Sequence, residues 1–254
     1  MSLVFEVKKL DLFYQKKCVF CKLDFKLYSN KITGIIGPSG CGKSSFLSVL
    51  NRLSDLNPDI TRNGHVLFQG KDIFSSDCEL KELRKKVALI FQEPSPLPLS
   101  IYDNIALALK EHGFSDIDSR VKKALSDVGL WDELEGDIGR SALKLSGGQK
   151  QRLCIARSIA LEPEVLLLDE PCSSLDPIST EIIESLLLKL KERFSILIVT
   201  HNLAQAKRLC DRVAMFWYNS DWQAGEKLIE GNADEVFAET KNQIVNDFLA
   251  GVRG

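Results

Sequence analysis

Apolar and polar residues follow different periods along the chain, and the changes of period divide it into elements. Residues 4–12 and 18–27 alternate between apolar and polar positions, which predicts two antiparallel strands around a turn at 15–17. Other strands are predicted at the short apolar runs 32–36, 65–68, 87–91, 165–168 and 196–199. Helices are predicted at 45–50, 177–193 and 202–210. Strands and helices alternate after an antiparallel start, which predicts an α/β fold.

The middle of the chain has a different texture. Three prolines break regular structure between residues 93 and 99, so this stretch is predicted to be a loop. From residue 100 to about 162 the pattern is helical, with glycines as turn signals. We therefore predict one domain, in which 1–92 and 163–254 form an α/β core with an N-terminal antiparallel β subdomain. Residues 93–162 are predicted to form an inserted helical subdomain.

Composition and charge narrow the class of protein. The net charge of −2 over 254 residues does not favour bulk attraction to nucleic acid. No apolar run approaches the roughly 20 residues of a membrane span, and no signal peptide is expected, so any membrane contact is expected to occur through a partner. Seven cysteines in apolar segments indicate reduced thiols of a cytoplasm. Cys18 and Cys21 have C-x-x-C spacing without a second pair, so we interpret them as thiols buried in a strand, in preference to a metal or redox site.

The first chemical motif lies between the predicted strand 32–36 and the predicted helix 45–50. It fits G-x-x-x-x-G-K-[ST], the phosphate-binding loop or Walker A motif. Glycines let backbone N–H groups surround phosphate oxygens, and the helix N-terminus adds its positive end. Lys43 is expected to reach the β- and γ-phosphates, and Ser44 to ligate Mg²⁺. A plain glycine-rich turn is the alternative, which the strand–loop–helix order disfavours. The predicted nucleotide-binding residues of this loop are Gly37, Pro38, Ser39, Gly40, Cys41, Gly42, Lys43, Ser44 and Ser45.

Two adjacent carboxylates, Asp169 and Glu170, follow the apolar run at 165–168. Ligands sit at the carboxyl ends of strands in a parallel α/β sheet. One carboxylate can hold Mg²⁺ through its water shell, and the other can orient or deprotonate an attacking water. The alternative is a solvated acidic turn after a core strand, and the presence of a phosphate loop in the same chain disfavours this alternative.

Two further features are weaker by themselves. Ser146-Gly147-Gly148-Gln149 reads as a capped helix start with accessible backbone N–H groups, which could hold an anion. Tyr14, at the corner of the first two strands, could stack on a purine, although a lone aromatic residue in a strand is more often core. Phe13 is the less favoured choice for that role.

The order of these motifs resembles that of an ATP-binding-cassette ATPase over nearly the whole chain. The resemblance implies a P-loop NTPase fold with an ABC-type nucleotide-binding domain, and ATP with Mg²⁺ as ligands. The motifs that carry it are the phosphate loop, 145–149, 168–171, 174–176 and Thr200-His201.

The resemblance also implies a role for each matching residue. Ser146 to Gln149 becomes the signature motif, which closes over ATP held by a second copy of the chain. Gln92 becomes the switch-loop glutamine that meets Mg²⁺ and the attacking water, and Asp169 the second-shell metal residue. The remaining implied roles are the general base for Glu170, γ-phosphate contact for His201, adenine stacking for Tyr14 and linkage of the two nucleotide sites for Asp176. The alternatives are an ordinary loop histidine for His201 and a strand-end polar residue for Gln92.

A finer resemblance is to the ATP-binding subunit of bacterial phosphate importers. The segments that carry it are 51–56, 96–104, 130–133, 146–157, 170–177 and the tail 247–254. The chain departs from that pattern at Ser45, at Asn30-Lys31 and in the aromatic stretch 216–222. These departures leave the transported solute open, because the ATPase subunit does not itself bind it.

The resemblance therefore implies an ATP-hydrolysing subunit that powers a membrane importer, with inorganic phosphate as the expected solute. Its expected partners are a second copy, integral membrane permease subunits and, indirectly, a solute-binding protein, at the cytoplasmic face of the membrane. The alternatives are an importer ATPase for another solute, such as an amino acid, and a soluble cassette ATPase of DNA repair or translation. A non-hydrolytic interaction module is disfavoured by Lys43, Asp169 and Glu170.

The loop 93–99 is expected to contact the membrane partner. Leu97, Leu99, Ile101 and Tyr102 are predicted to form an apolar groove for a partner helix, as the resemblance implies. The alternative is that these side chains pack inward as part of the helical core.

Overall fold

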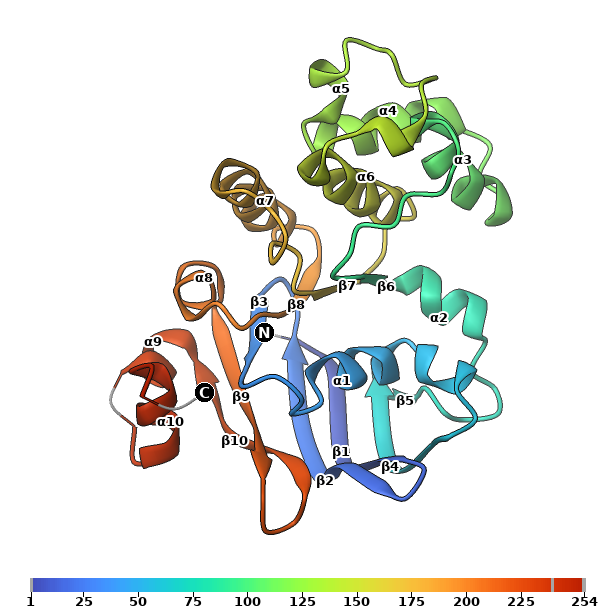
Figure 1. The fold of residues 1–254 in the computed structure, drawn as a ribbon. Helices are drawn as coiled ribbons and strands as arrows, with labels where there is room; N and C mark the ends of the chain where they lie inside the picture. Colours follow the sequence, from blue (N-terminus) through green and yellow to red (C-terminus); the bar gives the residue numbers. More distant parts are fainter. Residues whose placement is uncertain (1, 239, 253–254) are drawn as a thin grey trace.

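A computed structural model describes residues 2–238 and 240–252. The described strands form one ten-stranded sheet in the order β5-β4-β1-β2-β10-β9-β3-β8-β7-β6 (Figure 1). The strands are β1 Leu3–Tyr14, β2 Lys17–Tyr28, β3 Ile32–Ile36, β4 Ile60–Phe68, β5 Lys71–Asp72, β6 Val87–Ile90, β7 Val165–Asp169, β8 Ser195–Val199, β9 Arg212–Asn219 and β10 Ala224–Asn232. The helices are α1 Lys43–Leu50, α2 Leu80–Lys86, α3 Ile101–Glu111, α4 Ile117–Asp127, α5 Leu130–Glu133, α6 Gly147–Ile159, α7 Pro177–Leu190, α8 Leu203–Leu209, α9 Ala233–Phe237 and α10 Gln243–Leu249, with 3₁₀ turns η1 Leu53–Leu56 and η2 Ala142–Lys144.

The parallel part of the sheet consists of β6, β7, β8, β3 and β9. Residues 166–168 and 196–199 of its central strands are fully buried, because helices or other strands cover both faces. The predicted strands at 32–36, 87–91, 165–168 and 196–199 are confirmed to within one residue. Since these strands run in the same direction, their carboxyl ends lie at one edge of the sheet.

The antiparallel part of the sheet begins with the predicted hairpin. β1 pairs with β2 around a two-residue turn and with β4 on its other side, so both N-terminal strands are confirmed. The strand predicted at 65–68 begins earlier than predicted, because β4 continues back through Asn63-Gly64 opposite a bulge in β1. The β9–β10 hairpin, which joins the two parts of the sheet, was not predicted from the sequence.

The helices α3 to α6 gather at one end of the molecule, beyond β6 and beside α7 (Figure 1). Their apolar faces form a shared core that includes Ile105, Leu109, Leu125 and Leu153. The helical texture predicted for 100–162 and the loop predicted for 93–99 are both confirmed. No helix within the described residues is long and apolar enough to cross a membrane.

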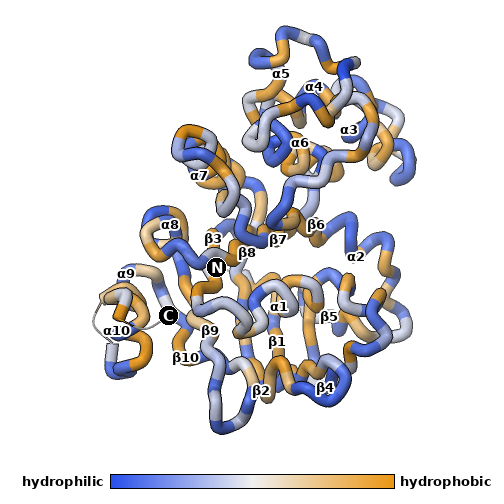
Figure 2. Tube along the Cα trace, viewed as in Figure 1, coloured by the Kyte–Doolittle hydropathy of each residue, from blue (hydrophilic) through white to orange (hydrophobic). Residues whose placement is uncertain are grey.

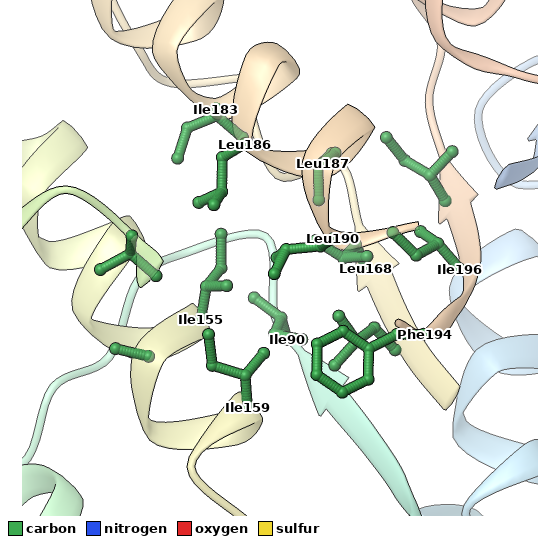
Figure 3. Packing of buried hydrophobic residues seen from close by; sticks show 14 of the residues in the cluster. Ile90, Ile155, Ile159, Leu168, Ile183, Leu186, Leu187, Leu190, Phe194 and Ile196 are labelled. Atoms are coloured by element: carbon green, nitrogen blue, oxygen red, sulfur yellow. The ribbon is translucent and has the colours of Figure 1, made fainter. Parts of the chain in front are cut away.

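A contiguous apolar core connects the helices to the parallel strands. Ile155 and Ile159 of α6 meet Leu187 and Leu190 of α7 above the strands β6, β7 and β8 (Figure 3). Each of these side chains is at most 3% exposed. Burying one such side chain stabilises the fold by roughly 1.5–3 kcal/mol, so the position of α6 is tightly coupled to the strand that ends at Asp169.

A second core lies on the other face of the sheet, beneath α1. Phe20, Phe25, Phe46 and Phe216 form an edge-to-face cluster with ring centroids 5.1–6.5 Å apart. Such pairs contribute about 0.5–1.5 kcal/mol each beyond their buried area. The cluster joins β2, α1 and β9 under the phosphate loop. Hydrophobic residues follow the parallel strands, whereas α2 is largely hydrophilic (Figure 2).

Candidate functional site

The predicted catalytic residues meet at the carboxyl edge of the parallel strands. The phosphate loop follows β3, Gln92 follows β6, Asp169 ends β7, and His201 follows β8. The pairing order β3-β8-β7-β6 makes these strands neighbours although they are far apart in the sequence. The fold therefore brings four separate segments to one edge, as expected for a ligand site in a parallel sheet.

The phosphate loop is held in a tight conformation by close backbone contacts. At Gly37, where φ is 145°, an added Cβ would lie 2.0 Å from the backbone oxygen of Phe216, so only glycine fits. Lys43 is 6% exposed, and its Nζ donates hydrogen bonds to the backbone oxygens of Gly37 and Pro38, each at 2.8 Å. The cation is thus fixed inside the loop, where backbone N–H groups and the start of α1 can surround phosphate oxygens.

The carboxylate of Asp169 lies beside the phosphate loop, and one of its oxygen atoms accepts no hydrogen bond within the described residues. Within the described chain, its buried Oδ1 has no hydrogen-bond partner. Burial raises the pKa of Asp169 above its ordinary value, and a hydrogen bond with the Ser44 side chain offsets part of this effect. A hydroxyl and a carboxylate are oxygen donors that Mg²⁺ accepts while keeping several waters, and Gln92 follows the neighbouring strand β6. These residues therefore fit a bound Mg²⁺.

Glu170 is the centre of a second polar cluster. Its Oε2 lies 2.8 Å from His201 Nδ1 and 3.5 Å from Gln92 Nε2. Gln92 Nε2 also donates to Ser173 Oγ at 3.3 Å. Ser173 was not predicted from the sequence as a site residue. The backbone of Glu170 has φ 42°, an unfavourable conformation for a non-glycine residue, and its N–H donates to the Val199 oxygen at 2.9 Å. The surrounding structure thus holds the backbone of Glu170 in a strained conformation.

A cleft of about 410 Å³ opens over the phosphate loop. Tyr14 and Glu170 line it together with Ser39, Lys43 and other residues of the loop. Tyr14 is 44% exposed, so its ring belongs to the cleft and not to the core, and Phe13 does not line it. Sequence reasoning missed the remaining lining residues, Lys17, Cys18, Val19 and Tyr218.

Ser146 to Gln149 form the N-terminus of α6, and they do not line this cleft in the described part of the chain. Ser146 and Gln149 cap each other: the Ser146 hydroxyl accepts from the Gln149 N–H at 3.3 Å, and Gln149 Oε1 accepts from the Ser146 N–H at 3.0 Å. Asp176 caps α7 by accepting from the Ser179 N–H at 3.0 Å, and it too lies outside the cleft lining. One chain therefore does not bring these residues to its own phosphate loop.

Comparison with known proteins shows the family of the chain. A family model described as "ABC transporter" matches residues 20–173, which is more than half of the chain. The chain belongs to the ABC transporter family. The resemblance that the motif order indicated is thereby confirmed.

Individual ABC proteins match along almost the full length. The phosphate import ATP-binding protein PstB 1 of Nitrosococcus oceani is 46% identical over 251 residues, which cover 98% of this chain and 90% of that protein. The corresponding PstB of Thermotoga maritima is 42% identical over 257 residues, which cover 100% of both. Among solved structures, cbiO1 of Clostridium perfringens, part of the ABC transporter complex cbiONQ, has a TM-score of 0.79 at 28% identity and covers 94% of this chain and 92% of its own. The predicted fold class is confirmed.

The four residues predicted to form an apolar groove differ in their exposure in this ABC protein. Leu97 and Leu99 are 36% and 39% exposed, but Ile101 is fully buried. Ile101 was wrongly placed in the groove, because it lies in the first turn of α3 and faces the helical core. Tyr102 is half-buried and donates its hydroxyl to Asp118 at 2.5 Å. Phe91, which was not predicted, is 51% exposed just before the loop. We call Phe91, Leu97 and Leu99 the loop surface.

The expectation that Cys18 and Cys21 are buried thiols is modified by the structure. Cys18 and Cys21 are only partly buried, and their sulfur atoms lie 2.7 Å apart. Burial first, and then contact with Cys21, raises the pKa of Cys18 to about 12, so its thiol stays protonated near neutral pH. Of the importer-like tail 247–254, the last two residues lie outside the described residues.

Proposed function

We propose that this chain is the ATP-hydrolysing subunit of an importer for inorganic phosphate. The observation that carries the ATPase assignment is the placement of Glu170, 2.8 Å from His201, at the rim of the phosphate-loop cleft. The phosphate assignment rests on relatives of 42–46% identity that are named phosphate import ATP-binding proteins and that the chain matches over 90–100% of their length. Both parts can be tested separately, the first with purified protein and the second in cells.

The residues of the site divide the work of hydrolysis. The loop from Gly37 to Ser45 binds the β- and γ-phosphates through backbone N–H groups and Lys43. Ser44, Gln92 and Asp169 would hold Mg²⁺, which when bound neutralises part of the charge on the phosphates. Glu170 accepts a proton from the attacking water, and His201 orients Glu170 and contacts the γ-phosphate. The strained backbone of Glu170 is consistent with a carboxylate that must be aimed.

We propose that a second copy of the chain completes the site. Ser146 to Gln149 carry a helix N-terminus suited to an anion, yet they do not line the cleft of their own chain in the described residues. Two copies facing each other would place each signature motif over the ATP of the other, with Asp176 near both sites. Closure of this pair would move integral membrane permease subunits at the cytoplasmic face of the membrane, and a solute-binding protein would act through those subunits.

Phosphate uptake by cells tests the transport assignment. Cells that lack this chain should regain uptake of labelled phosphate when the unmodified chain is supplied, and should not regain it with Glu170→Gln. An importer for another small solute is the second candidate, because the departures at Ser45, at Asn30-Lys31 and in 216–222 leave the solute open. Unchanged phosphate uptake in the deficient cells, together with lost uptake of an amino acid, would favour that candidate.

Replacement of Tyr14 by alanine should lower the affinity for ATP more than it lowers the affinity for inorganic triphosphate. The ring lines the cleft and is 44% exposed, and stacking acts only on the base. The expected loss for ATP is on the order of 1 kcal/mol, the scale of one aromatic contact. Calorimetric titration of both ligands measures the difference. Equal losses for the two ligands would mean that Tyr14 only supports the hairpin turn.

An aspartate in place of Leu97 or Leu99 should uncouple the ATPase from its membrane partner. The loop surface is apolar and exposed, and the prolines of the loop 93–99 restrict its backbone conformation. This surface therefore suits an apolar helix from a permease subunit. ATP binding by the isolated variants should be unchanged, while association with the membrane subunits and phosphate uptake should be lost. Leu56→Asp, at an exposed leucine of η1, is the matched control and should retain both. Undiminished uptake in the Leu97 and Leu99 variants would contradict the docking role.

A further inference from the structure

The β9–β10 hairpin places an aromatic side chain in the nucleotide cleft. Successive residues of β9 face opposite sides of the sheet. Phe216 packs in the aromatic cluster beneath α1, and Trp217 points to the other face, where its ring meets Phe248 of α10 at 6.0 Å. Tyr218 therefore returns to the face of the phosphate loop, where it lines the cleft and is 38% exposed.

The hairpin is seated directly on the phosphate loop. Gly225, the cross-strand partner of Tyr218, lies so close that an added Cβ would be 2.5 Å from the Cys41 oxygen and 2.8 Å from the Val19 oxygen. On the preceding strand, the Phe216 oxygen makes the equally close approach to Gly37 described above. These contacts between backbones leave little room for the hairpin to shift. The position of Tyr218 relative to the loop is therefore set by the fold and not by a flexible side-chain contact.

The sheet order sets the space between the two tyrosines that line the cleft. Tyr14 is on β1 and Tyr218 is on β9, with β2 and β10 between them. Strands lie about 4.8 Å apart, so three intervals separate the two backbones by roughly 14 Å. The register aligns Tyr218 with Gly225 and Phe20, so a residue without a side chain lies beside Tyr218. Tyr14 pairs with Lys17, three residues from Phe20 along β2, so the two tyrosines are also offset along the strands by about 10 Å. Stacked aromatic groups lie about 4.5–7 Å apart between centroids, so a flat ring system between two tyrosine rings needs about 9–14 Å, which side chains reaching from these two positions can span.

We propose that Tyr218 is the second aromatic wall of the base-binding end of the cleft and that, with Tyr14, it makes the site selective for a nucleotide over a bare polyphosphate. This inference rests on the proposed function, because it names the base contacts of the same ATP site. Tyr218 acts by contact with the base, while the phosphate loop binds the triphosphate independently of it. The residue is a specificity determinant and takes no part in proton transfer.

Calorimetric titration of the purified full chain with ATP and with inorganic triphosphate, both with Mg²⁺, tests the proposal. Tyr218→Ala should lower the affinity for ATP about five-fold, the equivalent of one aromatic contact, and leave the affinity for triphosphate unchanged. Tyr218→Phe should keep the affinity for ATP, because the ring remains. Trp222→Ala is the matched control, since Trp222 is 66% exposed on the same hairpin and outside the cleft lining, and it should change neither affinity. In Tyr14→Ala with Tyr218→Ala, the preference for ATP over triphosphate should fall about 25-fold if the two contacts are additive.

Each outcome decides between two roles. Equal losses of affinity for ATP and for triphosphate in Tyr218→Ala would show that the ring only supports the phosphate loop. Unchanged affinity for ATP would show that the ring does not contact the base. Either result overturns the proposal. Failure of the unmodified chain to bind ATP, or an affinity unaffected by Lys43→Ala, would instead overturn the proposed function. Matching thermal unfolding curves for all variants would show that the comparison is made between folded proteins.

Discussion

Glu170→Gln should bind Mg-ATP as the unmodified chain does and hydrolyse it at least about a hundredfold more slowly. Loss of a positioned general base typically costs 10²–10⁴-fold in rate, because an amide orients water without accepting its proton. Binding should persist because Lys43 and the loop backbone, which hold the phosphates, are unchanged. Release of phosphate at saturating ATP measures the rate, and calorimetry measures the affinity.

The same variant tests whether two copies enclose the nucleotide. With hydrolysis stalled, ATP should keep two chains together, and light scattering should show a doubled mass when ATP is present and a single mass without it. Glu181→Gln is a suitable control, because this residue is exposed on α7 and should retain normal turnover. A stalled variant that is saturated with ATP and still monomeric at high concentration would contradict the paired arrangement, while leaving the role of Glu170 as base intact.

Lys43→Ala should lower ATP affinity by at least about a hundredfold. Lys43 is held inside the phosphate loop by two backbone oxygens at 2.8 Å, so its ammonium is in place before the nucleotide arrives. Hydrogen bonds to charged groups contribute about 1.5–3 kcal/mol each, and this cation is expected to contact two phosphates. Calorimetric titration with Mg-ATP measures the loss. Unlike Tyr14→Ala, this variant should lower the affinities for ATP and for inorganic triphosphate to the same extent.

A control lysine separates this specific effect from a change in overall charge. Lys16→Ala removes an exposed lysine from the β1–β2 turn, outside the cleft lining, and should leave ATP affinity unchanged. Circular dichroism during heating should show that both variants unfold as the unmodified chain does. Normal ATP affinity in a folded Lys43→Ala variant would remove the basis for the nucleotide site.

Local patterns were enough to predict most of the elements. The antiparallel hairpin of β1 and β2 and the parallel strands β3, β6, β7 and β8 were found from residue periodicity alone. These strands are either half-buried or buried on both faces, and each condition leaves a clear apolar pattern. The β9–β10 hairpin was missed because polar and apolar residues do not alternate regularly along it, as in residues 217–219 and 226–230, and no two-residue turn signal separates its strands.

Burial of single residues could not be predicted with the same success. Ile101 was expected in a groove with Leu97 and Leu99, as the resemblance implied, but the start of α3 turns it into the core. Ser173 carries no motif of its own, and only the turn after β7 brings its hydroxyl to Gln92. In both cases the decisive quantity is the direction of a side chain, which depends on where the helix or turn begins.

The sequence by itself was enough to recognise the phosphate loop and the acidic pair, because each is a short segment whose chemistry depends on local backbone geometry. The candidate roles of the residues around them were implied by the resemblance that the order of the motifs carries. The tertiary structure decided which of these segments share one space. Glu170 and His201 are 31 residues apart and meet only because β7 and β8 are neighbours in the sheet. Tyr218 joins Tyr14 in one cleft only because the β9–β10 hairpin lies between β2 and β3. Strand order is set by the packing of the whole chain, so no local pattern contains it.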